Sequence, residues 1–178
     1  LHAPFTPFAQ NGELNASKDV IGRLADQAQR MSVNTIFVGG SMGQFDTLTT
    51  AERKTLMTAW VAAAKPLRSL FVICQVGDTA IATAVELARH AASVGCDAIA
   101  SVPPYYEKTD DADTIVDFLQ PISAGAPSLP LFFYHIPSVT GCRVKVSALF
   151  RAAAAKLPML AGVKWVGTDL ADWFELTR

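Results

Sequence analysis

Two kinds of segment alternate along this chain. Short apolar runs rich in β-branched residues, each closed by glycine, proline or a polar turn, are followed by longer segments whose apolar residues recur at helical spacing. The predicted strands cover residues 3–6, 35–38, 70–76, 97–102, 131–136 and 160–166. Because these runs are apolar almost throughout, we expect the strands to be buried on both faces, as in a parallel sheet covered by helices.

Helix-end signals lie between the predicted strands. Asn15 or Ser17 can cap the first helix, Thr49 and Glu52 have the spacing of a capping box, and Asp78 is a candidate cap for the third helix. The predicted helices cover residues 20–31, 49–65, 78–95, 113–123, 146–156 and 169–177. The sequence therefore predicts six strand–helix units.

Two α/β architectures are built from such units: the open doubly wound sheet and the closed eight-stranded barrel. Six units complete an open sheet, but the first turn, residues 8–12, lacks the G-x-G-x-x-G pattern of dinucleotide-binding members. A barrel needs about 250 residues. In that case residues 1–178 form a single domain with six of eight units, and the C-terminal part is missing.

Composition excludes several classes of function. With 15 basic and 16 acidic residues the net charge is −1, so there is no basic excess to bind nucleic acid. No apolar run reaches the roughly 18 residues that a membrane helix requires. Cys74, Cys96 and Cys142 are dispersed among apolar residues without metal-ligand spacing. We expect them to be reduced core residues of a cytoplasmic protein.

Lys164 is the first candidate for chemistry, because it interrupts an otherwise apolar predicted strand. Side chains alternate faces along a strand, so Gly162, Lys164 and Val166 share one face. Burial lowers the pKa of an ammonium and makes the amine a usable nucleophile toward a ketone. The alternative is a strand-end lysine that pairs with a carboxylate or reaches solvent.

Tyr134 is the second candidate and lies in the preceding predicted strand. Consecutive strands of such folds are usually neighbours, so the Tyr134 phenol could reach the Lys164 nitrogen or a substrate bound to it. A phenol beside an amine can carry a proton during the reaction. The alternative is an ordinary core tyrosine. Because side chains alternate between the two faces of a strand, His135 should point away from Tyr134, toward the helices.

The glycine-rich turn of residues 39–43 is the third candidate. Glycines at 39, 40 and 43 allow successive N–H groups to face one spot, which suits a small carboxylate. In a barrel, Ser41 and Met42 would lie across the mouth from Lys164, so that a 2-keto acid fits between them. The alternative is a tight turn that binds nothing.

Tyr105 and Tyr106 follow two prolines at the end of the predicted strand 97–102. They could border a pocket or pack on a neighbouring subunit. The three histidines are scattered, so we assign no metal site and no cofactor from them.

Taken together, these motifs resemble the N-acetylneuraminate lyase and dihydrodipicolinate synthase family of Schiff-base aldolases. The most specific part is Tyr-x-Ile-Pro-x-x-Thr-Gly at residues 134–141 combined with Gly-x-Lys at residues 162–164. The other matching segments are residues 3–8, 11–15, 36–44, 51–53 and 103–106.

The resemblance implies a (β/α)8 TIM barrel, usually a homotetramer, that acts on small molecules without a cofactor. Lys164 would form the Schiff base with pyruvate and Tyr134 would relay the proton. Ser41 and the position of Met42, in the turn that contains Gly40, would bind the pyruvate carboxylate. Tyr105 matches a tyrosine that joins the proton relay in family members.

Within the family, residues 134–141 look like the N-acetylneuraminate lyase branch. Val139 stands where the synthase branch usually has an arginine, which argues against that reaction. Three departures are also present: Met42 replaces a usual threonine, Gln44 a common glutamate, and Val166 a frequent threonine or serine near the substrate. The resemblance implies a lyase for a 2-keto-3-deoxy sugar acid, with N-acetylneuraminate as the first candidate. Another aldolase or dehydratase of the family, or an impaired barrel that binds a keto acid, remains the alternative.

Overall fold

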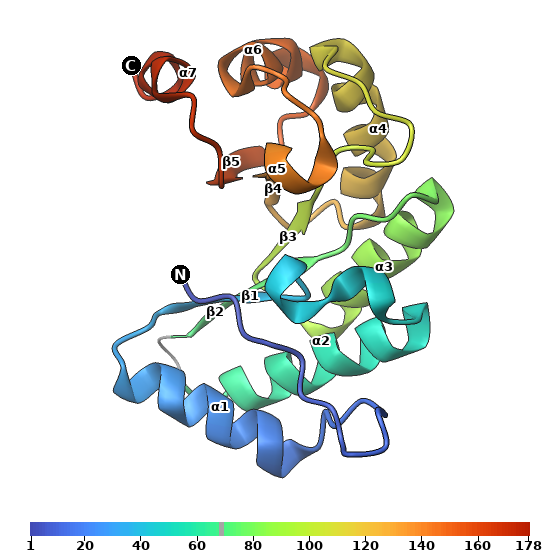
Figure 1. Ribbon diagram of the computed structural model, residues 1–178, viewed down its shortest axis with the longest axis vertical. Helices are drawn as coiled ribbons and strands as arrows, with labels where there is room; N and C mark the ends of the chain where they lie inside the picture. The colour runs from blue at the N-terminus through green and yellow to red at the C-terminus, as the bar shows by residue number, and fades with distance from the viewer. Residues whose placement is uncertain (68–69) are drawn as a thin grey trace.

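The computed structural model describes residues 1–67 and 70–178 and contains one parallel sheet (Figure 1). Its five strands lie in the order β1-β2-β3-β4-β5. The strands are β1 (Thr35–Val38), β2 (Phe71–Gln75), β3 (Ala98–Ser101), β4 (Leu131–His135) and β5 (Leu160–Trp165). The α-helices are α1 (Lys18–Arg30), α2 (Thr50–Ala64), α3 (Ile81–Val94), α4 (Ala112–Gly125), α5 (Pro137–Thr140), α6 (Val146–Lys156) and α7 (Leu170–Leu176), and two 3-10 turns are η1 (Ser41–Gly43) and η2 (Phe45–Thr47).

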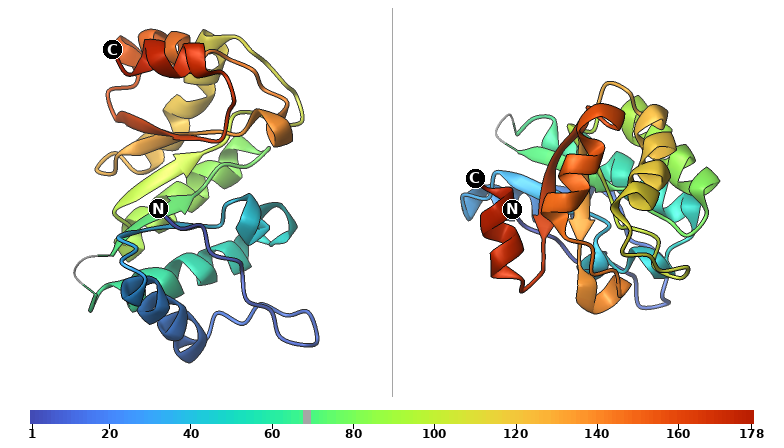
Figure 2. Two further views of the ribbon diagram at one scale, coloured as in Figure 1. Left: turned by 60° about the vertical axis from the view of Figure 1, so that its left-hand side comes forward. Right: turned by 90° about the horizontal axis from the view of Figure 1, so that it is seen from above.

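The order of the strands separates the two expected architectures. Each strand pairs in parallel with the next one along the chain, without the reversal of order that defines a doubly wound sheet. The helices lie around one side of the curved sheet, with α1 and α7 at opposite ends (Figures 1 and 2). The fold is therefore an incomplete (β/α) barrel rather than an open doubly wound sheet.

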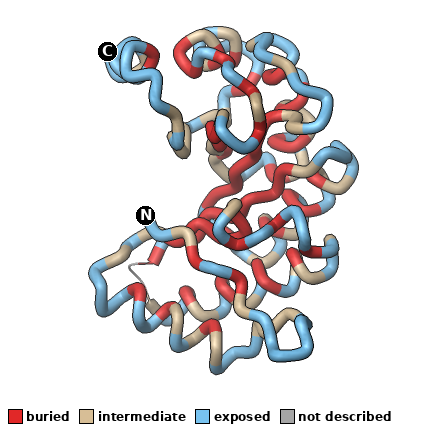
Figure 3. Tube along the Cα trace, in the orientation of Figure 1, coloured by how far each residue is buried: buried red, intermediate tan, exposed pale blue. Residues whose placement is uncertain are grey.

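The sheet has a different apolar core on each face. The larger core joins one strand face to the helices and includes Trp60 of α2, which is fully buried. The smaller core lies on the concave face and consists of Phe37, Phe45, Ile73, Ala98, Ala100, Val102, Tyr134 and Ile136. Buried residues concentrate in the strands and on the inner sides of the helices (Figure 3). Strands β1 to β4 are thus largely buried on both faces, as their composition predicts, whereas β5 at the sheet edge is only partly buried.

The predicted strand at residues 3–6 is wrong. This segment forms no ladder; only His2 bridges to Ile36, with one hydrogen bond from the His2 N–H to the Thr35 carbonyl and one from the Phe37 N–H to the His2 carbonyl, both 2.8 Å. Pro4 and Pro7 have no N–H to donate, so the pairing cannot continue along this segment. Five strands and one bridge replace the six predicted strands.

Helix ends follow the predicted signals with one exception. The Thr49 hydroxyl accepts from the Glu52 N–H, and the Glu52 carboxylate accepts from the Thr49 N–H at 2.8 Å, which completes the capping box. Ser17 caps α1. Asp78 does not cap α3, whose N-cap is Ala80. One oxygen of Asp78 accepts from the Ala80 N–H at 3.0 Å and the other binds a buried arginine.

The cysteines depart from the expectation of a reduced core. Cys74 on β2 and Cys96, just before β3, are paired in a disulfide, with their Cα atoms 6.7 Å apart. The pairing is available because β2 and β3 are neighbours in the sheet. Disulfides are typical of oxidising compartments. The expectation of reduced cysteines is therefore wrong for this pair, and the cysteines no longer support a cytoplasmic location.

The close approach of β4 and β5 depends on Gly162. The register shifts beside Phe132, so that Phe132 faces Gly162 and Tyr134 faces Lys164. An added Cβ at Gly162 would lie 2.7 Å from the Phe132 ring. Only a residue without a side chain therefore fits between the two strands at this point.

We expect Gly162→Ala to destabilise the fold by about 1–3 kcal/mol, because the new methyl group must displace the Phe132 ring. Gly22→Ala is the matched control: it lies within α1, and no described atom comes within 4 Å of its added Cβ. That control should stabilise by roughly 0.5–1 kcal/mol. Urea unfolding of the two variants measures the difference, and equal changes would contradict this account.

No helix in the described part of the chain is both long and apolar enough to span a membrane.

Candidate active site

Adjacent strands bring Lys164 and Tyr134 together on the concave face. Tyr134 on β4 pairs in register with Lys164 on β5, as the sequence predicts for neighbouring strands. The Lys164 Nζ lies 3.8 Å from the centre of the Tyr134 ring and 4.8 Å from the centre of the Phe37 ring. The amine therefore points into the barrel interior, within cation–π distance of two aromatic rings.

The glycine-rich turn reaches the same place from β1. The Ser41 hydroxyl and the Tyr134 hydroxyl are 3.3 Å apart and share a hydrogen bond. A Cβ added at Gly40 would lie 3.0 Å from the Phe37 ring and 4.0 Å from the Tyr134 ring, so the backbone of the turn passes close to both aromatic groups. The Met42 side chain, by contrast, is half exposed. The turn thus places a hydroxyl and its own backbone beside Tyr134.

A cavity of about 280 Å³ opens beside this group of residues. It is lined by Ser41, Phe45, Asp46, Val102, Tyr105, Ile136, Val139 and Thr140. The lining residues come from the turns that follow β1, β3 and β4. This is the end of the strands at which barrel enzymes bind their substrates. Ser41 and Tyr105, both sequence-predicted site residues, face this one cavity.

Tyr105 is partly buried against Phe45, with the ring centres 6.1 Å apart and the planes almost perpendicular. Burial raises the pKa of the Tyr105 phenol, and the carboxylate of Asp78 raises it further. The phenol therefore stays protonated at neutral pH and can donate a hydrogen bond to an anionic ligand.

Val166, a predicted site residue, and Val139, which is not one, are less enclosed. Val166 follows β5, where its N–H donates to the His135 carbonyl at 2.8 Å and its side chain is nearly half exposed. Val139 lines the cavity but is largely exposed at its rim. These side chains belong to the border of the site rather than to the group around Lys164.

Other titratable residues face away from the cavity. His135 points toward the helices, as predicted, and packs between Phe133 and Trp165. Burial lowers the pKa of its imidazole, an effect that Asp172 partly opposes. Burial raises the pKa of the Cys142 thiol, which makes it a poor nucleophile. No cluster of three metal-ligating side chains is present among the described residues.

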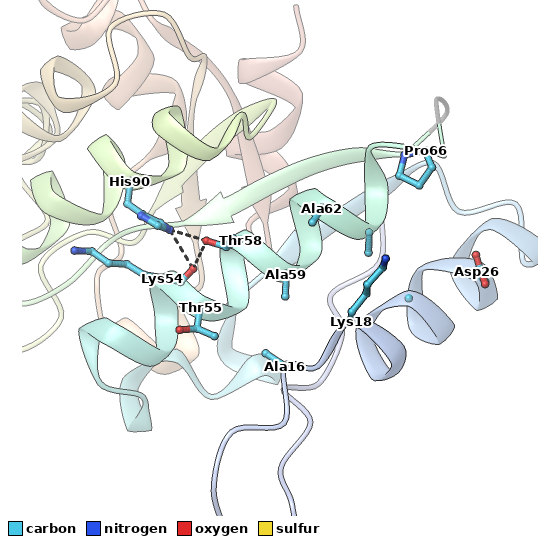
Figure 4. Close-up of a pocket in the computed structure, with 12 residues that line it drawn as sticks. Ala16, Lys18, Asp26, Lys54, Thr55, Thr58, Ala59, Ala62, Pro66 and His90 are labelled. Atoms are coloured by element: carbon cyan, nitrogen blue, oxygen red, sulfur yellow. Dashed lines mark hydrogen bonds between the residues drawn. The ribbon is translucent and has the colours of Figure 1, made fainter.

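A second cavity, about 610 Å³, lies outside the sheet, between α1 and α2 (Figure 4). Three of its polar residues, Lys54, Thr58 and His90, have partners. The His90 Nε2 lies 3.0 Å from the Thr58 hydroxyl and 3.1 Å from the Lys54 carbonyl, and the Lys54 Nζ pairs with Glu86. None of the sequence-predicted site residues lines this cavity.

Sequence reasoning missed several residues of the site, among them Phe37, Phe45 and Thr140. Phe37 contacts both Lys164 and Tyr134, while Phe45 and Thr140 line the cavity. Strand alternation could have found Phe37, because it separates Ile36 from Val38, which face the helices. Phe45 begins η2 and Thr140 ends α5, and both elements are too short for a periodic pattern to mark the direction of a side chain.

The parallel strands and the lysine at the mouth of the curved sheet define an α/β barrel protein with an amine in its site. The family model of the dihydrodipicolinate synthetase family matches residues 1–177, and the chain belongs to this family.

Similar proteins agree in fold and in sequence. The N-acetylneuraminate lyase of Rattus norvegicus is 37% identical over 172 residues, which cover 96% of this chain and 53% of the rat protein. The structure of Proteus mirabilis N-acetylneuraminate lyase matches with a TM-score of 0.92 and 30% identity, covering 99% of this chain and 58% of that chain. A catalytic lysine mutant of Ruminococcus gnavus sialic acid aldolase matches with a TM-score of 0.85 and 27% identity over 96% of this chain and 53% of that one. The chain thus spans about half the length of the relatives it matches.

Proposed function

We propose that this protein is a pyruvate-dependent carbon–carbon lyase that cleaves a 2-keto-3-deoxy sugar acid through a lysine Schiff base. The first candidate reaction converts N-acetylneuraminate into N-acetylmannosamine and pyruvate. The single observation that carries the proposal is the position of the Lys164 amine, which points into the barrel 3.8 Å from the Tyr134 ring. Relatives named N-acetylneuraminate lyase, and one solved relative named for its catalytic lysine, support it.

The proposed reaction begins at Lys164. Its neutral amine adds to the C2 ketone of the open-chain sugar acid, and loss of water gives an iminium ion. The carbinolamine hydroxyl takes the proton of the Tyr134 phenol as it leaves as water, and the Tyr134 phenolate oxygen then accepts the proton of the C4 hydroxyl while the C3–C4 bond breaks. The electron pair of that bond moves toward the iminium nitrogen, which leaves an enamine and releases the aldehyde. Protonation at C3 and hydrolysis then release pyruvate and restore the Lys164 amine.

The carboxylate of the substrate has a natural binding place in the glycine-rich turn. The Ser41 hydroxyl and the N–H groups of Ser41 and Met42 follow Gly40, next to the Tyr134 hydroxyl. These N–H groups start a helical turn and are therefore suited to bind an anion. Tyr105 would donate a further hydrogen bond, and Val166 would border the remaining part of the substrate. Ser41, Met42, Gly40, Tyr105 and Val166 are thus proposed to bind the substrate.

Two alternatives stay within the same family. A synthase that binds a second carboxylate would need a cation near Val139, but this side chain is apolar and largely exposed. A barrel that binds a keto acid without turnover is favoured by Met42, which offers no hydroxyl where the family has a threonine. Product analysis distinguishes these alternatives from the lyase.

We also propose that the enzyme is a homo-oligomer, a tetramer or dimer. Exposed apolar side chains such as Tyr106 and Phe174 support contact with further protein surface.

The test uses the protein as its gene encodes it. Pyruvate with borohydride should add a three-carbon unit to the peptide that contains Lys164, which mass spectrometry detects. N-acetylneuraminate should yield pyruvate and N-acetylmannosamine. A folded protein without the adduct would refute the proposal. An adduct together with turnover of a different sugar acid would reassign the substrate. An adduct without any turnover would favour a barrel that binds a keto acid but does not catalyse its cleavage.

A further inference from the structure

We propose that Arg53, from α2, is a positioning residue for this reaction: it fixes the cavity wall formed by Phe45 and Tyr105 and balances the charge of Asp78 beside it. This inference rests on the proposed function. Arg53 does not line the cavity itself and acts through these neighbours.

The guanidinium of Arg53 is almost completely buried, with 3% of the residue exposed. Its NH1 donates to the Asp78 carboxylate at 2.9 Å. Its NH2 donates to the Gln75 carbonyl at 3.2 Å and to the Gly77 carbonyl at 3.0 Å. A buried charge is costly unless it is paired and hydrogen-bonded, so these contacts hold the turn after β2 in one conformation.

This turn has little freedom on its other side. A Cβ added at Gly77 would lie 2.7 Å from the Ser101 hydroxyl and 2.9 Å from the Val102 N–H nitrogen. The turn is therefore held between Arg53 and the end of β3. Val102 also lines the cavity, so the turn fixed by Arg53 supports the cavity wall from behind.

A chain of contacts leads from Arg53 to Tyr105. The guanidinium carbon lies 5.3 Å from the centre of the Phe45 ring, and the rings of Phe45 and Tyr105 pack edge to face. Phe45 and Tyr105 both line the cavity that Ser41 shares. Loss of the guanidinium would therefore free Phe45 to move and change the position of the Tyr105 phenol.

Arg53 also influences the charge state of Tyr105. Besides burial, Asp78 and Asp46 raise the pKa of the phenol, while a hydrogen bond from Thr79 and the charge of Arg53 lower it. Removing Arg53 should therefore raise this pKa further, and removing the charge of Asp78 should lower it. The two substitutions act on one ion pair but shift the pKa of the Tyr105 phenol in opposite directions.

The test compares Arg53→Gln with Asp78→Asn in the protein as its gene encodes it. We expect kcat/KM for the sugar acid to fall about tenfold or more in Arg53→Gln, while the yield of pyruvate adduct at Lys164 changes by less than about threefold. The alkaline limit of kcat/KM should move to higher pH in Arg53→Gln and to lower pH in Asp78→Asn. Loss of structure alone would not shift the two limits in opposite directions.

Further variants protect the test against misfolding. Asp78→Asn keeps the shape of the side chain and leaves the two carbonyl contacts of Arg53 in place, so it reports on Tyr105 even if Arg53→Gln does not fold. Arg53→Lys keeps the charge and should restore the alkaline limit without restoring all of kcat/KM. Arg151→Gln removes an exposed guanidinium paired with Glu175 and should change nothing.

Two results separate the possible failures. If the wild-type protein forms the Lys164 adduct but Asp78→Asn leaves both kcat/KM and the alkaline limit unchanged, the role of Arg53 is refuted. The role of Arg53 is also refuted if the alkaline limit of kcat/KM moves in the same direction in Arg53→Gln and Asp78→Asn. If the wild-type protein forms no adduct, the proposed function itself fails.

Discussion

Replacement of Lys164 by alanine is expected to abolish the borohydride-trapped pyruvate adduct and to lower kcat by at least about 10⁴-fold. No other amine occupies the position of the Lys164 Nζ between the Phe37 and Tyr134 rings in the described part of the chain. The fold should persist, because Lys164 lies on the concave face of the edge strand β5, and β5 is only partly buried. Mass spectrometry of the reduced adduct and a pyruvate assay measure the two effects.

Lys164→Arg distinguishes the role of Lys164 as a nucleophile from the role of its positive charge. The guanidinium retains a cation beside the two rings but cannot form an imine, so this variant should be as inactive as alanine. Lys156→Ala removes an exposed lysine that pairs with Asp113 and should leave both adduct and turnover intact. Turnover that survives in Lys164→Arg would show that the lysine acts through charge alone.

Tyr134→Phe is expected to lower kcat by about 10²–10⁴-fold, the usual effect of losing a proton-transfer group. The ring that packs against Phe37, with 5.1 Å between the ring centres, stays in place, as does the aromatic face below Lys164. Only the hydroxyl and its hydrogen bond with Ser41 are lost, so the free energy of unfolding should fall by about 0.5–1.5 kcal/mol. The pyruvate adduct should still form at Lys164. Steady-state kinetics and thermal unfolding measure these quantities.

Two further variants define what the hydroxyl of Tyr134 does. Ser41→Ala removes only its partner, so kcat should fall less than in Tyr134→Phe, while KM rises because the carboxylate loses a donor. Ser93→Ala removes an exposed hydroxyl on α3 and should leave the kinetics unchanged. Tyr134→Phe with wild-type kcat would exclude the phenol from proton transfer.

The extent of sequence prediction differs between the parts of the fold. Five of the six predicted strands are confirmed, because buried parallel strands have a long apolar signal that turns interrupt clearly. The segment at residues 3–6 forms no strand and the chain bridges only at His2, since Pro4 and Pro7 remove donors that a ladder requires. Composition alone cannot show how many N–H groups of a segment find partners.

The site was predicted where it depends on strand periodicity. The alternation of side chains between the two faces of neighbouring strands predicts that Lys164 lies beside Tyr134, and the register of β4 and β5 confirms this contact. It was not predicted where it depends on turns. The ion pair between Arg53 and Asp78 joins residues 25 positions apart, and Asp78 was expected to cap a helix instead.

By itself, the sequence determined the α/β class, the parallel strands and the faces of Lys164 and Tyr134, because these follow from short-range periodicity and from the chemistry of single residues. Only the tertiary structure decided the contact between Ser41 and Tyr134, 93 residues apart, the burial of Arg53 beneath Phe45, and the Cys74–Cys96 disulfide. Such contacts depend on how distant segments pack against each other, and no local pattern records that packing.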